Sequence, residues 1–137
     1  LVTVNIQDTV NYVAPYPTYT IRFVRPATTQ VYMTVQVANL TTLPANYIVQ
    51  VQTALAAAFA NGFTSNDGTI NVPRARIGGQ TVAAEYAAPI LTLPNITPVA
   101  IYIGTSPSPV SGASLTLGID QQPVCPALNI NVVAVSV

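Results

Sequence analysis

The chain has 137 residues, enough for one domain that buries a hydrophobic core without disulfides. Half of the residues are hydrophobic and only 6% are charged, against roughly a quarter in typical soluble domains. With four arginines, no lysine and a net charge of zero, the chain lacks the clustered cations that contact phosphates, which excludes nucleic acid as its main partner. The apolar runs are far shorter than a membrane span, so we predict no membrane insertion. A surface so poor in charge favours coverage by other subunits.

The residue types that carry catalysis are scarce. There is no histidine to activate Cys125 and no second cysteine to pair with it, so we predict a buried, inert thiol. Glu85 could form a carboxylate pair with Asp67 or Asp120, but four scattered acids always offer some pair. The sequence therefore predicts no enzymatic activity, no cofactor and no metal site.

In chain order, residues 2–6 alternate between apolar and polar side chains and predict a first strand. Residues 11–18 contain Tyr12, Tyr16 and two prolines, which is typical of an irregular connection. We therefore assign residues 1–18 to an N-terminal strand and linker and residues 19–137 to a single domain. Strands are predicted at residues 19–24 and 31–37. The short turn between them, at residues 25–30, predicts an antiparallel hairpin.

A helix is the strongest local signal. Apolar residues recur every three or four positions from Ile48 to Phe59, with Thr42 as a capping candidate, Pro44 suited to a first turn, and Asn61-Gly62 as a stop. Residues 80–88 predict a weaker second helix that Pro89 should end.

Strands are predicted at residues 99–103, 115–119 and 130–137, with a tight turn at residues 66–68, a possible short strand at 70–72 and a loop at 121–128. The predicted fold class is α+β, a mostly antiparallel sheet with two helices packed against it, in the order β-β-β-α-α-β-β-β. The final strand carries no charge, so it lies either inside the sheet or at an edge that another chain covers.

Candidates for protein contacts are tyrosines, which are apolar at one end and polar at the other, and arginines, whose planar guanidinium suits interfaces. From residue type and position, the predicted contact residues are Tyr12, Tyr16, Arg22, Arg25, Arg74 and Arg76.

Several segments, in the same order, resemble the baseplate J-like proteins of tailed phages. They are YTIRFVRP at residues 19–26, VYMTV at 31–35, AAF at 57–59, VAAEYAAPI at 82–90, SLTLGIDQQP at 114–123 and NINV at 129–132. The resemblance extends over residues 19–137. It departs from the family around the second helix, where this sequence has mainly alanine instead of charged residues. Family members are longer, so the chain would correspond to their C-terminal domain.

The resemblance implies a structural role without catalytic residues. Such proteins form the wedge of the baseplate around the tail hub, in phages with contractile tails and in related injection particles. The implied partners are other baseplate subunits and copies of the chain itself, and the implied location is the virion tail. The alternative that the residues leave open is a receptor- or glycan-binding β-rich module of a tail or fimbria, because tyrosines on a neutral surface would also suit that role.

Overall fold

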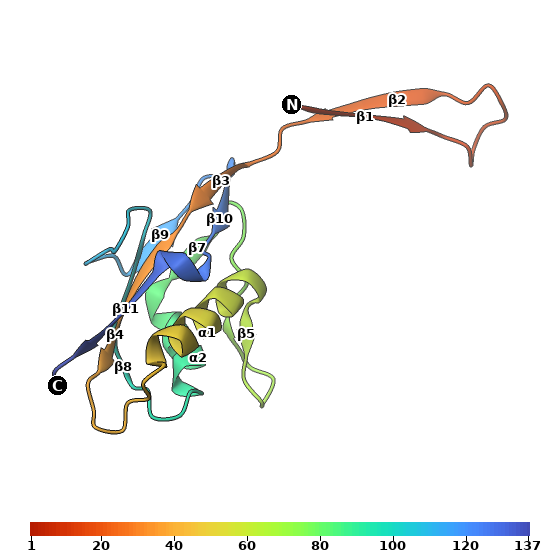
Figure 1. Ribbon diagram of the computed structural model, residues 1–137. Helices are drawn as coiled ribbons and strands as arrows, with labels where there is room; N and C mark the ends of the chain where they lie inside the picture. The colour runs from red at the N-terminus through yellow and green to blue at the C-terminus, as the bar shows by residue number, and fades with distance from the viewer.

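The computed structural model describes residues 1–137 and has two parts of different shape, an extended arm and a compact body (Figure 1). The arm comprises residues 1–24 and is built from β1 (Val2–Gln7) and β2 (Thr18–Phe23), which pair antiparallel. The body comprises residues 27–137 and holds all of the buried hydrophobic core. Arg25 and Pro26 connect the two parts.

The body is organised around the segment from residue 27 to residue 38. This segment contains β3 (Ala27–Gln30) and β4 (Tyr32–Ala38), which are separated only by the fully buried Val31. A later segment runs parallel to it, with β10 (Gln121–Val124) beside β3 and β11 (Ile130–Val135) beside β4. On the other side of β4 lies β8 (Pro98–Gly104), which is antiparallel to it. β4 is therefore the central strand of the main sheet.

Two small strand pairs complete the body. β5 (Phe63–Thr64) pairs with β6 (Ile70–Val72), and β7 (Gln80–Val82) pairs with β9 (Ser114–Thr116). Four of the six strand pairs are antiparallel, so the predicted α+β class with a mostly antiparallel arrangement is confirmed. The strands are more numerous and shorter than the pattern predicted. The turn predicted at residues 66–68 is present, with the Asp67 carboxylate accepting hydrogen bonds from the Ser65 hydroxyl and the Thr69 N–H.

The main helix, α1 (Tyr47–Asn61), lies against the sheet and fills the core with the side chains that its periodicity selected. These are Val51, Leu55, Ala58 and Phe59. Gly62 ends the helix as predicted, at a φ of 80°, and its N–H donates to the carbonyl of Ala58. The predicted start at Thr42 is wrong. Asn46 occupies the N-cap instead, because residues 40–47 form turns in which Leu40 and Pro44 accept backbone hydrogen bonds.

The second helix begins later in the chain than predicted. Residues 80–82 form a strand, residues 83–86 a 3₁₀ turn, and α2 spans Ala87–Leu91. Pro89 lies inside α2 and does not end the helix at Ala88. It is the third helical residue, where the missing N–H has no partner within the helix in any case.

Two predicted strand assignments are also wrong. Residues 19–24 do not form a hairpin with residues 31–37, because β2 pairs with β1 and β4 pairs with β8 and β11. The predicted loop at 121–128 contains β10, despite Pro123. β10 has a strand partner on one side only, so a proline whose nitrogen faces the open side removes no ladder hydrogen bond.

The uncharged final strand, β11, is at the edge of its sheet and not inside it. The edge is partly protected, because the side-chain amide of Gln52 on α1 donates to the carbonyl of Ile130 at 2.9 Å. Fewer backbone groups of β11 are therefore free to pair with another chain than the strand contains.

Candidate interaction surface

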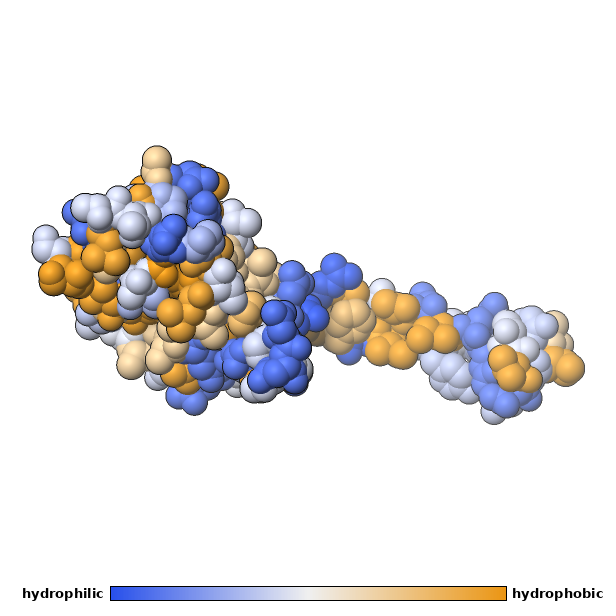
Figure 2. All heavy atoms as spheres, turned by 90° about the horizontal axis from the view of Figure 1, so that it is seen from below, coloured by the Kyte–Doolittle hydropathy of each residue, from blue (hydrophilic) through white to orange (hydrophobic).

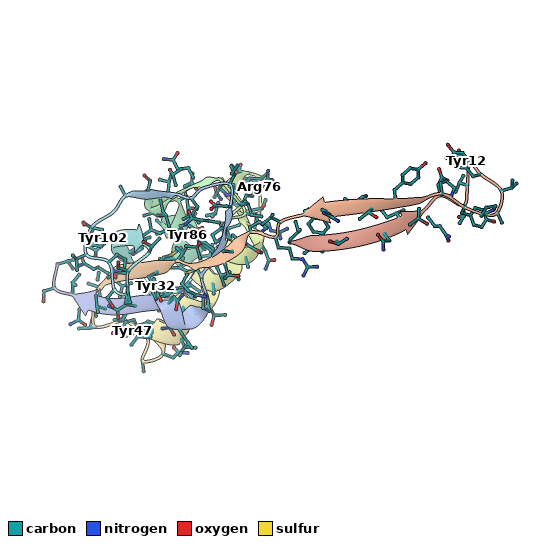
Figure 3. The ribbon with its side chains drawn as sticks, turned by 90° about the horizontal axis from the view of Figure 1, so that it is seen from above. Tyr12, Tyr32, Tyr47, Arg76, Tyr86 and Tyr102 are labelled. Atoms are coloured by element: carbon teal, nitrogen blue, oxygen red, sulfur yellow. The ribbon has the colours of Figure 1, made fainter.

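The structure separates the six predicted contact residues into three places. Tyr12 and Tyr16 lie between β1 and β2, in the tip of the arm, and are 53% and 36% exposed. Figure 3 labels Tyr12 at this tip. Arg22 lies on β2 opposite Thr3, and Arg25 lies at the base of the arm. Arg74 and Arg76 are the third pair, and they line a groove on the body.

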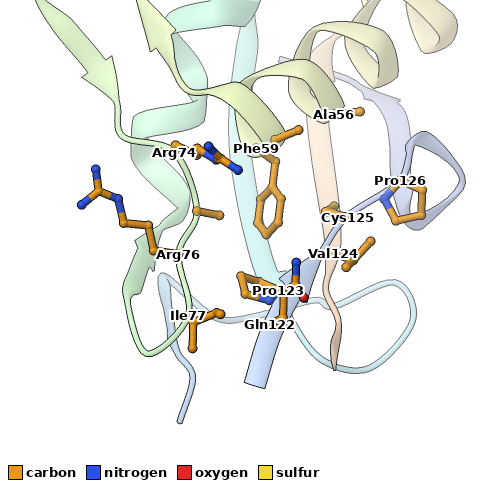
Figure 4. A pocket seen from close by; sticks show the side chains of 12 residues that line it. Ala56, Phe59, Arg74, Arg76, Ile77, Gln122, Pro123, Val124, Cys125 and Pro126 are labelled. Atoms are coloured by element: carbon orange, nitrogen blue, oxygen red, sulfur yellow. The ribbon is translucent and has the colours of Figure 1, made fainter. Parts of the chain in front are cut away.

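The groove has a volume of about 750 Å³ and lies between the C-terminal end of α1, the segment before Gly78, and β10 (Figure 4). Phe59 projects into it from α1, and Pro123 and Cys125 form the opposite wall. The two arginines are its only charged residues, and the guanidinium of Arg76 points away from the groove in Figure 4. None of the side-chain hydrogen bonds in the structure involves an arginine. The groove thus offers two free cations but no convergent set of polar groups.

Cys125 is buried, as predicted, with 6% of its surface exposed. Burial raises the pKa of its thiol to about 12, so the thiol stays protonated and unreactive at neutral pH. No group of three or more His, Cys, Asp or Glu side chains lies together in an arrangement that could hold a metal ion. No helix combines the length and the hydrophobicity that crossing a membrane requires.

The arm carries an unpartnered apolar surface that residue type alone did not identify. The register of β1 and β2 pairs Val2 with Phe23, Val4 with Ile21, and Ile6 with Tyr19. Residues paired directly across a ribbon, and residues two apart along a strand, share one face. One face of the arm is therefore entirely apolar. We call it the apolar arm face, and it consists of Val2, Val4, Ile6, Tyr19, Ile21 and Phe23.

The apolar arm face is in contact with solvent. Apart from the half-buried Val2, its members are 39–50% exposed, and no part of the body covers them (Figure 2). The opposite face is polar. Thr3 lies beside Arg22, and the Thr20 hydroxyl donates a hydrogen bond to the side-chain oxygen of Asn5 at 2.9 Å. A two-stranded ribbon in water is marginally stable by itself, because it has nothing on which to bury its apolar side. The apolar arm face has the residues of a buried sheet face, but no second layer packs against it.

The tip of the arm is more regular than the sequence suggested. The Asp8 N–H donates to the carbonyl of Pro17 at 3.1 Å, which extends the pairing of the strands by one hydrogen bond. The Asp8 carboxylate accepts hydrogen bonds from the backbone N–H groups of Val10 and Asn11 and from the Asn11 side chain. These hydrogen bonds, chiefly those from Asn11, lower the pKa of Asp8. The tip is thus held by its own contacts, at a distance from the body.

A signal for the apolar arm face was present in the sequence. Residues 2–6 and 19–23 both alternate, and the two stretches supply the whole face. The predicted hairpin pairs the second stretch with residues 31–37 instead, so the shared face was not predicted. A scan of the chain against protein-family models and a search of curated proteins both found no match.

Proposed function

We propose that the chain is a structural assembly component, and that it serves in the wedge of a phage tail baseplate or of a related injection particle. The observation that carries the assembly role is the apolar arm face. The largest contiguous apolar patch that a protein exposes is often a functional interaction site. The narrower assignment to a baseplate rests on the resemblance of residues 19–137 to baseplate J-like proteins.

The surface chemistry of the whole chain supports the same role. With a net charge of zero and four arginines that enter no side-chain hydrogen bond, the chain has little to keep copies or neighbours apart. Arginine is enriched at interfaces between proteins. Arg25 lies at the base of the arm, next to a partner that covers the apolar arm face, whereas Arg22 is on the opposite face of the ribbon.

The test is incorporation of arm variants into tail particles. Ile21→Glu places a charge on the apolar arm face, and Thr20→Glu places the same charge on the neighbouring residue of the opposite face. Neither residue contacts the core, so both variants should fold like the wild type by circular dichroism and thermal denaturation. We expect Ile21→Glu to reduce incorporation at least tenfold and Thr20→Glu to have little effect. Normal incorporation of Ile21→Glu would contradict an assembly role for the arm.

A second candidate function is binding of a receptor or glycan by the arm. The observation that favours it is the exposure of Tyr12 and Tyr16 at the tip, because aromatic rings can stack on sugars. A glycan array probed with the purified chain distinguishes the two functions. Hits that disappear in a Tyr12→Ala/Tyr16→Ala variant would favour the receptor role, whereas no hits, together with density for the chain in the basal ring of the tail, would favour the wedge.

A further inference from the structure

We infer that the apolar arm face packs against the same face of a second copy of this chain, with both arms pointing in the same direction. This inference rests on the proposed assembly function and identifies the partner that covers the arm. It follows from the chemistry of the face, from its shape and from its area.

The chemistry of the face favours a partner that is equally apolar. All six members are hydrocarbon or aromatic residues, and no charge or amide lies among them. Arg22 and the threonine hydroxyls of the strands are on the other side of the ribbon, because they occupy the alternate positions. A partner surface must therefore supply apolar side chains without a charge, and the arm of a second copy meets that requirement.

The shape of the face selects the direction of the arms. Both aromatic members, Tyr19 and Phe23, are on β2 with Ile21, whereas β1 contributes the aliphatic Val2, Val4 and Ile6. The face thus has a high side along β2 and a low side along β1. Close packing requires the high side of one copy to meet the low side of the other.

Only one two-fold arrangement brings β2 of each arm over β1 of its partner. When the two-fold axis runs along the strands, the arms point the same way and each strand faces the other kind of strand. When the axis runs across the strands, the arms point in opposite directions and β2 faces β2, so that bulky residues collide while β1 leaves a gap. The parallel arrangement places Phe23 over the partner's Val2, Ile21 over its Val4 and Tyr19 over its Ile6.

The area of the face leads to the same choice. Aromatic side chains bury roughly 150–250 Å² when fully covered, so the half-exposed Tyr19 and Phe23 offer about 200 Å², and with the aliphatic members the face offers on the order of 400 Å². A stable dimer buries roughly 800 Å² on each partner, so the two arms alone supply about half. Parallel arms put both bodies at the same end, where they can supply the remainder. Antiparallel arms would hold the bodies apart at opposite ends.

Self-association of the 137-residue chain is the first part of the test. By analytical ultracentrifugation we expect a species of twice the 14.3 kDa chain mass. Ile21→Glu should weaken the dimer at least 100-fold, and Thr20→Glu should change its dissociation constant less than threefold. A wild-type chain that stays monomeric at high micromolar concentration would overturn the inference. Dimers that Ile21→Glu leaves intact would overturn it as well.

The direction of the arms is measured with a spin label at the tip. Val10→Cys in a Cys125→Ala background gives one exposed thiol per chain, because Val10 is 89% exposed. At about 3.3 Å per residue, parallel arms bring the two labels within ~25 Å, whereas antiparallel arms separate them by ~40 Å or more. A long distance between the labels would overturn the parallel arrangement.

The outcomes separate this inference from the proposed function. Loss of particle incorporation in Ile21→Glu, together with a wild-type chain that is monomeric in solution, would mean that a different subunit covers the arm. In that case the assembly role would stand and the second copy would be rejected. Normal incorporation of Ile21→Glu, together with a wild-type dimer that the same substitution disrupts in solution, would reject the assembly role of the arm and keep the dimer.

Discussion

Replacing Tyr86 with phenylalanine should make the protein more stable. Tyr86 is fully buried in the core, its ring stacks on Phe59 with centroids 6.3 Å apart, and its hydroxyl has no hydrogen-bond partner. A buried polar group without a partner costs roughly 1–3 kcal/mol. Phenylalanine keeps the ring and its stacking and removes only the hydroxyl, at the expense of a small void.

We therefore expect Tyr86→Phe to raise the free energy of unfolding by about 1 kcal/mol, which corresponds to an increase in Tm of roughly 4 °C. Urea denaturation followed by circular dichroism measures the change, and an unchanged m-value shows that the unfolded state is not affected. Tyr12→Phe is the matched control, because Tyr12 lies in the exposed tip of the arm and should change the stability by less than about 0.5 kcal/mol.

The pH dependence gives an independent check on the same residue. Burial raises the pKa of Tyr86 well above its ordinary value of 10.0. Above pH 10 the unfolded chain therefore releases this proton while the folded chain retains it, so stability falls as the pH rises, by up to about 1.4 kcal/mol per pH unit. Tyr86→Phe should lose this component. A Tyr86→Phe variant that is less stable than the wild type and has the same alkaline slope would refute the reasoning. The Tyr86 hydroxyl would then have a hydrogen-bond partner in the folded protein.

Three further predictions concern the body. Gln52→Ala should lower the free energy of unfolding by about 1 kcal/mol in urea denaturation, since it leaves the carbonyl of Ile130 at the edge of β11 without its donor; unchanged stability would show that water replaces the amide. Gly112→Ala should lower the stability several times more than Gly68→Ala, although both glycines have positive φ. A Cβ at Gly112 would lie 2.4 Å from a backbone carbonyl oxygen, whereas a Cβ at Gly68 meets open space. Equal losses of Tm in the two variants would contradict this difference. The wild-type stability should decline between pH 9 and pH 12, because the buried Cys125 thiol keeps its proton in the folded state until about pH 12 while the unfolded chain releases it. Cys125→Ala should make this decline shallower by up to about 1.4 kcal/mol per pH unit. Identical alkaline profiles of the two proteins by thermal denaturation would show that the thiol is accessible.

The features that the sequence predicted correctly are local. Val51, Leu55 and Phe59 mark the buried face of α1 because the helical repeat places them on one side, whatever the helix packs against. Ile48 belongs to the same repeat but is 40% exposed, since it lies in the first turn. The stop at Gly62 follows from a backbone conformation that glycine adopts without strain.

The choice of strand partners could not be predicted in the same way. An alternating pattern shows that one face of a strand is apolar, but it does not identify the strand or the chain that covers that face. β4 pairs with β11, almost one hundred residues later, and β3 pairs in parallel with a strand that contains Pro123. The apolar arm face was missed for this reason. Its alternating pattern is that of a core strand, but no other part of residues 1–137 packs against it.

The direct continuation of the arm into the central strand has a mechanical consequence. A pull on the arm enters the body through Pro26 and then acts along β3 and β4. The hydrogen bonds of Ala27 with Asp120 and of Val31 with Val124, like the ladder between β4 and β11, run across the direction of the pull. These bonds must therefore be sheared together and cannot be unzipped one at a time. A pull on the arm is therefore resisted by the hydrogen bonds of β3 and β4 as a group.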